Sequence, residues 1–481
     1  MKYTLIAGIL GLFAASISQA QLAGTLNQVV SPVRPIIDRT PSDLKAIREE
    51  AKRSVQSTTE GINSLSTLAS GVIANLPAPQ FKAPAATTIL STSGQPVVNE
   101  VTVEDGFLAV EKEWLFLGEE ADKVHLQGTN IEIQEAQFLP ALSKWLYNVK
   151  VTGNEDEVSH IRNRLPKSLQ DQIGRNHIYL SQSEVSTKGS LLRHVDKINV
   201  STQQFESCPT PLRIGMVDTH VTTTHPLLSH IVFTQASFIV EQREGQDPRP
   251  NQNNGLDSYA ADSKKQTSKA SELAGGVAFS SDHGTAVASL LAASMPESSQ
   301  VFNASVFYSR NSVSQGATLM SLIEGLNYLA SQQVDAINMS LAGPDNPVLA
   351  RVIKQLDESG IQIIAAVGNE GPASLPLYPA AYPETLGITA VDKSHAIYRW
   401  ANQGNYVDFA AVGVSVEAAH PDGKVIRQTG TSMASPRATA LYACFLRTEL
   451  ERNAALLKLQ QLALDTGPPG RDSVFGFGVL P

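Results

Sequence analysis

Three polar side chains stand where they could form a nucleophile and the groups that activate it. Ser432 lies in the segment Gly430-Thr431-Ser432-Met433-Ala434-Ser435-Pro436, at the start of an apolar helical stretch. His283 begins another apolar stretch, and Asp218 follows the strand-like run 214–217. A serine hydroxyl is a weak nucleophile at neutral pH and needs an adjacent base, which an acid orients. These residue types indicate acyl-transfer chemistry.

Acyl transfer also needs hydrogen-bond donors for the oxyanion that forms. Asn369, in Val367-Gly368-Asn369-Glu370-Gly371, offers a side-chain amide directly after a strand-like run. Ser432 opens a helix, whose dipole favours negative charge nearby. Each residue alone has a commoner structural role, as a cap, a core histidine or a turn. Together, at strand ends and helix starts, the four indicate a catalytic site.

The elements that must position these side chains are strands alternating with helices after about residue 206. The runs 214–217, 336–341 and 361–367 are predicted strands. One helix face carries Leu319, Leu322, Ile323, Leu326 and Leu329, and Pro347 opens another helix with Gly360 just past its end. This rhythm predicts an α/β fold, a three-layer, mostly parallel sheet with helices on both faces. Such a sheet places ligands at the carboxyl ends of its strands.

Residues 206–481 resemble a subtilisin-like serine peptidase. The resemblance rests on Val217-Asp218-Thr219, His283-Gly284-Thr285, Asn338-Met339-Ser340-Leu341, Gly368-Asn369-Glu370-Gly371 and the segment from Gly430 to Pro436. The order of the acid, base, amide and serine also matches the family. The resemblance implies that Ser432 is the nucleophile, His283 the general base and Asp218 the acid that orients it. Asn369 and the backbone amide of Ser432 would form the oxyanion hole.

The same resemblance implies how a substrate binds. Ser340, Leu341 and Ala342 would form an edge that pairs with an extended polypeptide. Ala366, Val367 and Gly368 would form walls of the specificity pocket, and Leu377 stands at a floor position that is often glycine. A shortened pocket would favour small or medium apolar side chains before the cut; the alternative is that Leu377 points elsewhere. The bond Tyr378-Pro379 is expected to be cis, as in relatives.

The chain departs from the family pattern near the catalytic residues. His220 replaces a usual glycine, and Leu227 replaces an aspartate that commonly ligates calcium. Ala286 follows the histidine motif, and Arg437-Ala438-Thr439 follows the serine motif. These changes are expected to crowd the active-site helices. No cofactor is expected; a structural calcium ion is possible, but no motif supports it, and no metal-ligating residue is assigned.

The N-terminal part of the chain reads as three segments and a module. Residues 1–20 have the pattern of a cleaved secretory signal, which predicts a secreted or periplasmic protein. Residues 21–97 are predicted to be a helical and linker region, and 98–181 a small α+β module with strands near 145–151 and 175–180. By its place before the catalytic part, the module would be a propeptide that acts as an intramolecular inhibitor. Processing would fall in the linker 182–205.

Composition narrows the partners. The net charge of −9 over 481 residues gives no electrostatic case for nucleic acid, and no later apolar run is long enough for a membrane span. A monomer is expected. The two cysteines, Cys208 and Cys444, could form one bridge but not a disulfide framework. The role of the long insertion 231–280, whose residues 240–280 are polar, stays open between substrate access and plain insertion.

Two other classes of enzyme share parts of this pattern. An α/β-hydrolase esterase would show Gly-x-Ser-x-Gly, but Ala434 stands at the second glycine position and the order of the partners is reversed. Serine-carboxyl peptidases place an acid where Asn369 stands and a glutamate in place of His283. A catalytically silent, polypeptide-binding relative remains the alternative to an exported serine endopeptidase.

Overall fold

The computed structural model describes residues 86–127, 130–153, 156–181, 208, 210–239, 277–311 and 314–481. All of them belong to one compact unit, Ala83–Pro481. The predicted signal peptide, most of the 21–97 region, the predicted processing linker and nearly all of the polar stretch 240–280 lie outside the described residues.

A seven-stranded sheet with parallel pairing between all neighbours forms the centre of the chain after residue 208, which we call the catalytic part after its predicted role. Its order is β16-β15-β14-β12-β7-β9-β8. The strands are β7 (Arg213–Asp218), β8 (Val232–Ser237), β9 (Gln300–Ser305), β12 (Ala336–Met339), β14 (Gln362–Ala366), β15 (Thr385–Val391) and β16 (Phe409–Val412). The strands predicted from the sequence are therefore present, and β8 lies inside the insertion 231–280.

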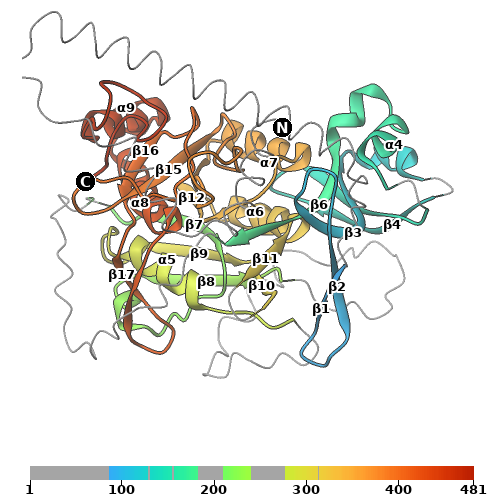
Figure 1. Ribbon diagram of the computed structural model, residues 1–481, viewed down its shortest axis with the longest axis horizontal. Helices are drawn as coiled ribbons and strands as arrows, with labels where there is room; N and C mark the ends of the chain where they lie inside the picture. The colour runs from blue at the N-terminus through green and yellow to red at the C-terminus, as the bar shows by residue number, and fades with distance from the viewer. Residues whose placement is uncertain are drawn as a thin grey trace, which may run out of the picture. The chain divides into compact units, whose positions relative to one another are not determined.

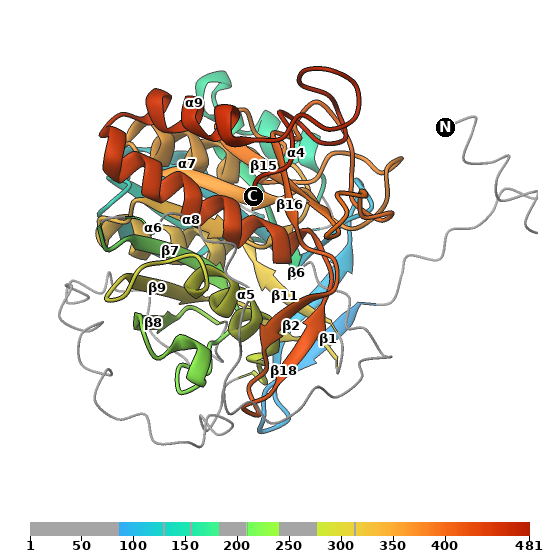
Figure 2. The same ribbon diagram turned by 90° about the vertical axis from the view of Figure 1, so that its left-hand side faces the viewer.

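Helices cover both faces of this sheet (Figure 1). The helices α5 (Asp282–Ala292) and α8 (Thr431–Glu449) lie on one face, with α9 (Arg452–Leu462) against α8. The helices α6 (Leu319–Ser331) and α7 (Pro347–Glu358) lie on the other, and Figure 2 shows α8 and α9 in front of α7. The predicted three-layer arrangement is confirmed. No helix in the described ranges is long and apolar enough to cross a membrane.

The two helices of the second face begin where the sequence provides caps. The Thr318 side chain accepts a hydrogen bond from Ser321 N at the start of α6. Asn346 accepts from Val348 N at the start of α7, and Pro347 occupies the first position. The apolar stripe of α7 is buried, and Gly360, with φ of 88°, follows the helix end as predicted.

Residues 87–181 form a separate α+β layer. Its strands are β1 (Thr87–Leu90), β2 (Pro96–Thr102), β3 (Leu108–Gly118), β4 (Ile131–Leu139), β5 (Lys144–Val151) and β6 (Ile173–Ser181), with the helix α4 (Val158–Asn163) between β5 and β6. Trp114, Phe116, Tyr147 and Ile161 lie in its core. The hairpin β1–β2 was not predicted, and the boundary predicted after residue 97 falls inside β2.

The strand β6 belongs to two parts of the molecule at once. On one edge it pairs with β3 of the module. On the other edge it pairs antiparallel with β11 (Gln315–Thr318). Its last residues also pair with β13 (Leu341–Ala342), on the edge opposite β11. With β10 (Tyr308–Ser309) paired to β11, a single nine-stranded sheet runs from the module into the catalytic part. Figure 1 shows β6 and β11 side by side.

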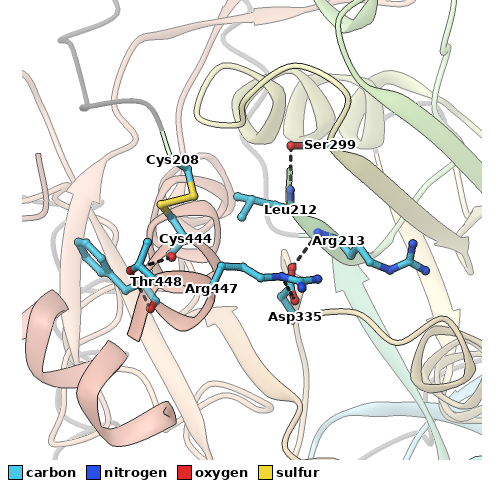
Figure 3. The surroundings of a disulfide bond; sticks show 9 residues. Cys208, Leu212, Arg213, Ser299, Asp335, Cys444, Arg447 and Thr448 are labelled. Carbon is cyan, nitrogen blue, oxygen red and sulfur yellow. Dashed lines mark hydrogen bonds and ion pairs between the residues drawn. A yellow bond between two sulfur atoms is a disulfide. The ribbon is translucent and has the colours of Figure 1, made fainter. Parts of the chain in front are cut away.

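A disulfide joins Cys208 to Cys444 on α8, with 5.6 Å between the Cα atoms, so the pairing left open by the sequence is present (Figure 3). Nearby, Arg447 on the same helix forms an ion pair with Asp335 at 2.8 Å. The other oxygen of Asp335 accepts from Arg213 N at the start of β7. These contacts connect α8 to the first strand of the catalytic part.

Candidate active site

Asp218 and His283 are joined by a hydrogen bond of 2.6 Å between Oδ1 of the aspartate and Nδ1 of the histidine. Asp218 is the last residue of β7, and His283 is the second residue of α5. Both side chains are buried. Nδ1 is hydrogen-bonded to the carboxylate, so the other ring nitrogen, Nε2, is left to act as a base. Nε2 has no hydrogen-bond partner among the described residues.

A glycine makes this close approach possible. Gly284 follows the histidine, and its amide donates to Oγ1 of Thr219 at 2.7 Å. A Cβ atom at Gly284 would lie 2.5 Å from the carbonyl oxygen of Thr219, closer than real Cβ contacts. The backbone amide of Thr219 in turn donates to Asp218 Oδ1 at 2.7 Å. The start of α5 therefore packs directly on the turn after β7.

Ser432 is the second residue of α8 and is fully buried in this state. Its carbonyl oxygen accepts from the hydroxyl of Ser340 at 3.1 Å. The Ser340 hydroxyl also lies 3.0 Å from that of Ser435 and accepts from Asn338 Nδ2 at 3.0 Å. Ser340 was predicted only as part of the substrate edge. The structure adds a second role, because its side chain holds the first turn of α8.

Asn369 lies at the other side of the α8 start. Its side-chain oxygen accepts from both the backbone amide and the hydroxyl of Thr431, each at 3.0 Å. These two bonds fix the carboxamide oxygen and so assign Nδ2 as the donor end of the side chain. Thr431 was not singled out from the sequence, although its place inside the serine motif was the available signal. Gly368 N also donates to Thr431 Oγ1, at 3.3 Å.

The residues predicted to line the specificity pocket come together after β14. Ala366 ends that strand, and Val367 and Gly368 follow it, with Gly368 at φ of 108°. The Leu377 side chain is buried, and its Cδ1 lies 2.8 Å from the place where a Cβ of Gly368 would stand. Leu377 therefore contacts the predicted wall. The Tyr378-Pro379 bond is cis, as expected.

The unusual residues around the site have partners of their own. The His220 ring packs on Phe279 with 5.3 Å between centroids, and its Nε2 lies 3.0 Å from Gln235 Nε2. Burial lowers the pKa of His220 below its usual value. Arg437 donates to the Ser294 hydroxyl at 3.0 Å and to the Pro481 carbonyl at 2.7 Å. These contacts join the turn after β7 to β8, and α8 to the segment after α5.

The predicted substrate edge is paired with β6. Leu341 and Ala342 form β13 and lie opposite Ser181 and Leu180. The register on the other side of β6 pairs Leu180, Tyr179 and Ile178 with Gly316, Ala317 and Thr318. An extended segment therefore lies between two strands of the catalytic part, which the sequence did not reveal. No cluster of three or more potential metal ligands occurs in the described ranges.

The parallel sheet, the buried acid–base pair and the serine at a helix start agree with the subtilisin-like arrangement expected from the sequence. The profile of the subtilase family matches residues 211–478, more than half of the chain. The chain belongs to the subtilase family.

Individual relatives cover a smaller part. Subtilisin amylosacchariticus of Bacillus subtilis subsp. amylosacchariticus is 37% identical over 175 residues, 34% of this chain and 46% of its own. The minor extracellular protease Epr of Bacillus subtilis is 30% identical over 165 residues, 34% of this chain and 26% of its own. The major intracellular serine protease of the same species is 34% identical over 27% of this chain and 42% of its own. The chain spans at most about half the length of these relatives.

Proposed function

We propose that the chain is the precursor of an exported serine endopeptidase. The observation that carries this proposal is the 2.6 Å hydrogen bond between His283 Nδ1 and Asp218 Oδ1, formed in a domain in which Ser432 is the second residue of α8. Membership of the subtilase family supports it. The names of the curated relatives, which include proteases of bacteria, agree with peptide-bond hydrolysis.

In the proposed reaction, the hydroxyl of Ser432 attacks the carbonyl carbon of the scissile peptide bond. His283 accepts the hydroxyl proton at Nε2 and then delivers it to the leaving amine as the C–N bond breaks. Asp218 holds the imidazole in the tautomer with hydrogen on Nδ1 and stabilises the imidazolium. A water molecule then hydrolyses the acyl-enzyme, with His283 again as base.

The proposed oxyanion hole consists of Asn369 Nδ2 and the backbone amide of Ser432. Two bonds from Thr431 to the Asn369 oxygen keep the amide in one orientation, which reduces the reorganisation needed when charge develops. The position of Ser432 at the start of α8 adds the positive end of the helix dipole.

The proposed substrate is an extended polypeptide that pairs with Leu341 and Ala342, main chain to main chain. The contact of Leu377 with Gly368 supports a shortened pocket, built also from Ala366 and Val367. We therefore expect a preference for small or medium apolar side chains immediately before the cut. A peptide-library profile dominated by Phe, Tyr or Arg at that position would contradict this.

We propose that the N-terminal module is the intramolecular inhibitor. Its strand β6 lies between β11 and β13, where a substrate strand would lie. The module also packs on α6 and α7: Asn176 Oδ1 accepts from Met320 N at 3.1 Å, and Asn346 Nδ2 donates to the Arg175 carbonyl at 2.9 Å. Processing after β6 would free the cleft. The apolar segment at 1–20 supports export to the periplasm or medium.

Covalent labelling tests the proposed chemistry. The full chain is expressed, allowed to mature and treated with a fluorophosphonate probe. One label per molecule is expected, with none in Ser432→Ala and full labelling in Ser359→Ala, which removes an exposed serine at the end of α7. A matured protein that binds peptides but takes no label would support the silent polypeptide-binding relative instead.

A further inference from the structure

One carboxylate of the module is buried against the catalytic part, where it accepts hydrogen bonds from two side chains. The Glu100 side chain, on β2, is 0% exposed. Arg310 donates from Nε at 2.8 and 2.9 Å and from its terminal nitrogen at 2.7 Å. The hydroxyl of Tyr308 donates to the same carboxylate at 2.8 Å. Such charge-assisted, forked bonds are the strong ones in proteins.

The donors and the carboxylate come from different sides of the interface. Tyr308 belongs to β10, and Arg310 follows it, so both stay with the catalytic part after processing. Glu100 would leave with the module. Burial opposes the charge of Arg310, but its bonds to Glu100 outweigh that effect and raise its pKa. Once Glu100 departs, the remaining hydrogen bond described for the guanidinium is the one to Ser314, at 3.2 Å.

These donors stand beside β6, the strand that lies between β11 and β13. A Cβ at Gly316 of β11 would lie 2.8 Å from Arg310 Cδ and 2.9 Å from Ile178 Cγ2, so the two side chains meet above Gly316. Ile178 also clusters with Tyr308. The next residue, Tyr179, points to the opposite face, where its hydroxyl reaches the Pro344 carbonyl.

We infer that Arg310 and Tyr308 form a binding site for an acidic side chain of the substrate. That side chain would come from the substrate residue that takes the position held by Ile178 in the precursor. This inference rests on the proposed peptidase function, with β6 standing in place of a substrate strand. A glutamate at that position would direct its carboxylate to the guanidinium that Glu100 occupies. Glu100 thereby keeps the site filled until the module leaves.

The test uses the matured enzyme and pairs of peptides that differ by one Glu or Gln. The pair is moved one residue at a time upstream of the cut. At one position, kcat/KM for Glu is expected to exceed that for Gln by about tenfold, as for a single partly exposed charge-assisted contact. The adjacent positions, which point away, should show no such preference. Raising the ionic strength should shrink the preference.

Variants assign the preference to its donors. Arg310→Gln should abolish it, by lowering kcat/KM for the Glu peptide to the value for the Gln peptide, while Tyr308→Phe should weaken it. Arg427→Gln, an exposed arginine on β18 (Val425–Gln428), is the matched control and should keep it. If Arg310→Gln fails to mature, the wild-type profile and its salt dependence still test the inference.

Equal rates for the Glu and Gln peptides at every position would overturn this inference alone. No hydrolysis of any peptide and no fluorophosphonate label overturn the proposed function, and the inference with it.

Discussion

The hydroxyl of Tyr179 donates to the carbonyl oxygen of Pro344 at 3.0 Å, across the boundary between the module and the catalytic part. Tyr179 is completely buried, and it lies on β6, the strand that we propose stands in the place of a substrate. Its ring contacts Gly343, where a Cβ would lie 2.4 Å from Tyr179 Cδ1. Gly343 therefore has to be a glycine for the ring to bind, and the tyrosine is an anchor of the module.

Substitutions of Tyr179 should measure this anchor. In the uncleaved Ser432→Ala precursor, Tyr179→Phe should lower the free energy of unfolding by about 1 kcal/mol, the value of one hydrogen bond. Tyr179→Ala should cost about 3–5 kcal/mol, because it removes a buried aromatic ring. Denaturant titration checks both. Exposed Tyr→Phe changes elsewhere should have little effect, and equal costs for Phe and Ala would contradict the anchoring role.

Asn369→Ala should lower kcat by about 100- to 1000-fold with little change in KM, a range taken from a subtilisin amide donor. Thr431→Val should have a smaller effect, since the Thr431 backbone amide still holds the Asn369 oxygen. Steady-state kinetics on one good peptide substrate measure both. A Thr431→Val variant that raises KM alone would show that Thr431 acts in substrate binding rather than in positioning Asn369.

Gly284→Ala should disturb the acid–base pair, because the added Cβ would lie 2.5 Å from one backbone oxygen and 2.8 Å from the next. We expect a fall in kcat of at least tenfold together with a loss of stability. Gly423→Ala is the contrast: it also meets backbone strain, at φ of 84°, but has open space around it. It should cost about 1 kcal/mol of stability and no activity. Equal kinetics in the two variants would refute the close-packing argument.

His220 should make stability depend on pH. Its pKa is lowered in the folded protein by burial, so the folded state prefers the neutral ring. The contribution is therefore complete above the unfolded pKa of about 6.5 and is lost as the pH falls through the lower folded value. Denaturant unfolding should be measured on the Ser432→Ala precursor, with and without His220→Gln, between pH 7 and 5. The free energy of unfolding should fall more steeply in the protein that keeps His220. Parallel curves would exclude His220 as the source.

Much of the catalytic part could be predicted because its signals are local. The strands at 214–217 and 361–367 are short apolar runs, and their ends place Asp218 and Asn369 at one edge of a parallel sheet. The start of α7 at Pro347 and the glycine after its end, Gly360, are equally local signals. Physical rules that act within a few residues sufficed for these elements.

The hairpin β1–β2 could not be predicted in the same way, because its stability comes from partners far along the chain. Glu100 on β2 is paired with Arg310, and Ile89 and Val98 cluster with Tyr308. The second role of Ser340 was missed for the same reason, since its partners Ser432 and Ser435 lie on α8. Sequence spacing carries no information about such pairings until the fold brings them together.

The bond between Cys208 and Cys444 closes a covalent ring of chain, with a sequence separation of 236 residues. A backbone cut inside the ring leaves both pieces attached, so such nicked molecules should migrate as one species on a gel until a reductant is added. A cut between Ser181 and Cys208 lies outside the ring and leaves no covalent link between the N-terminal piece and the rest of the chain. The disulfide therefore distinguishes cuts by position: a chain cut between Cys208 and Cys444 stays one covalent molecule, and a chain cut before Cys208 becomes two.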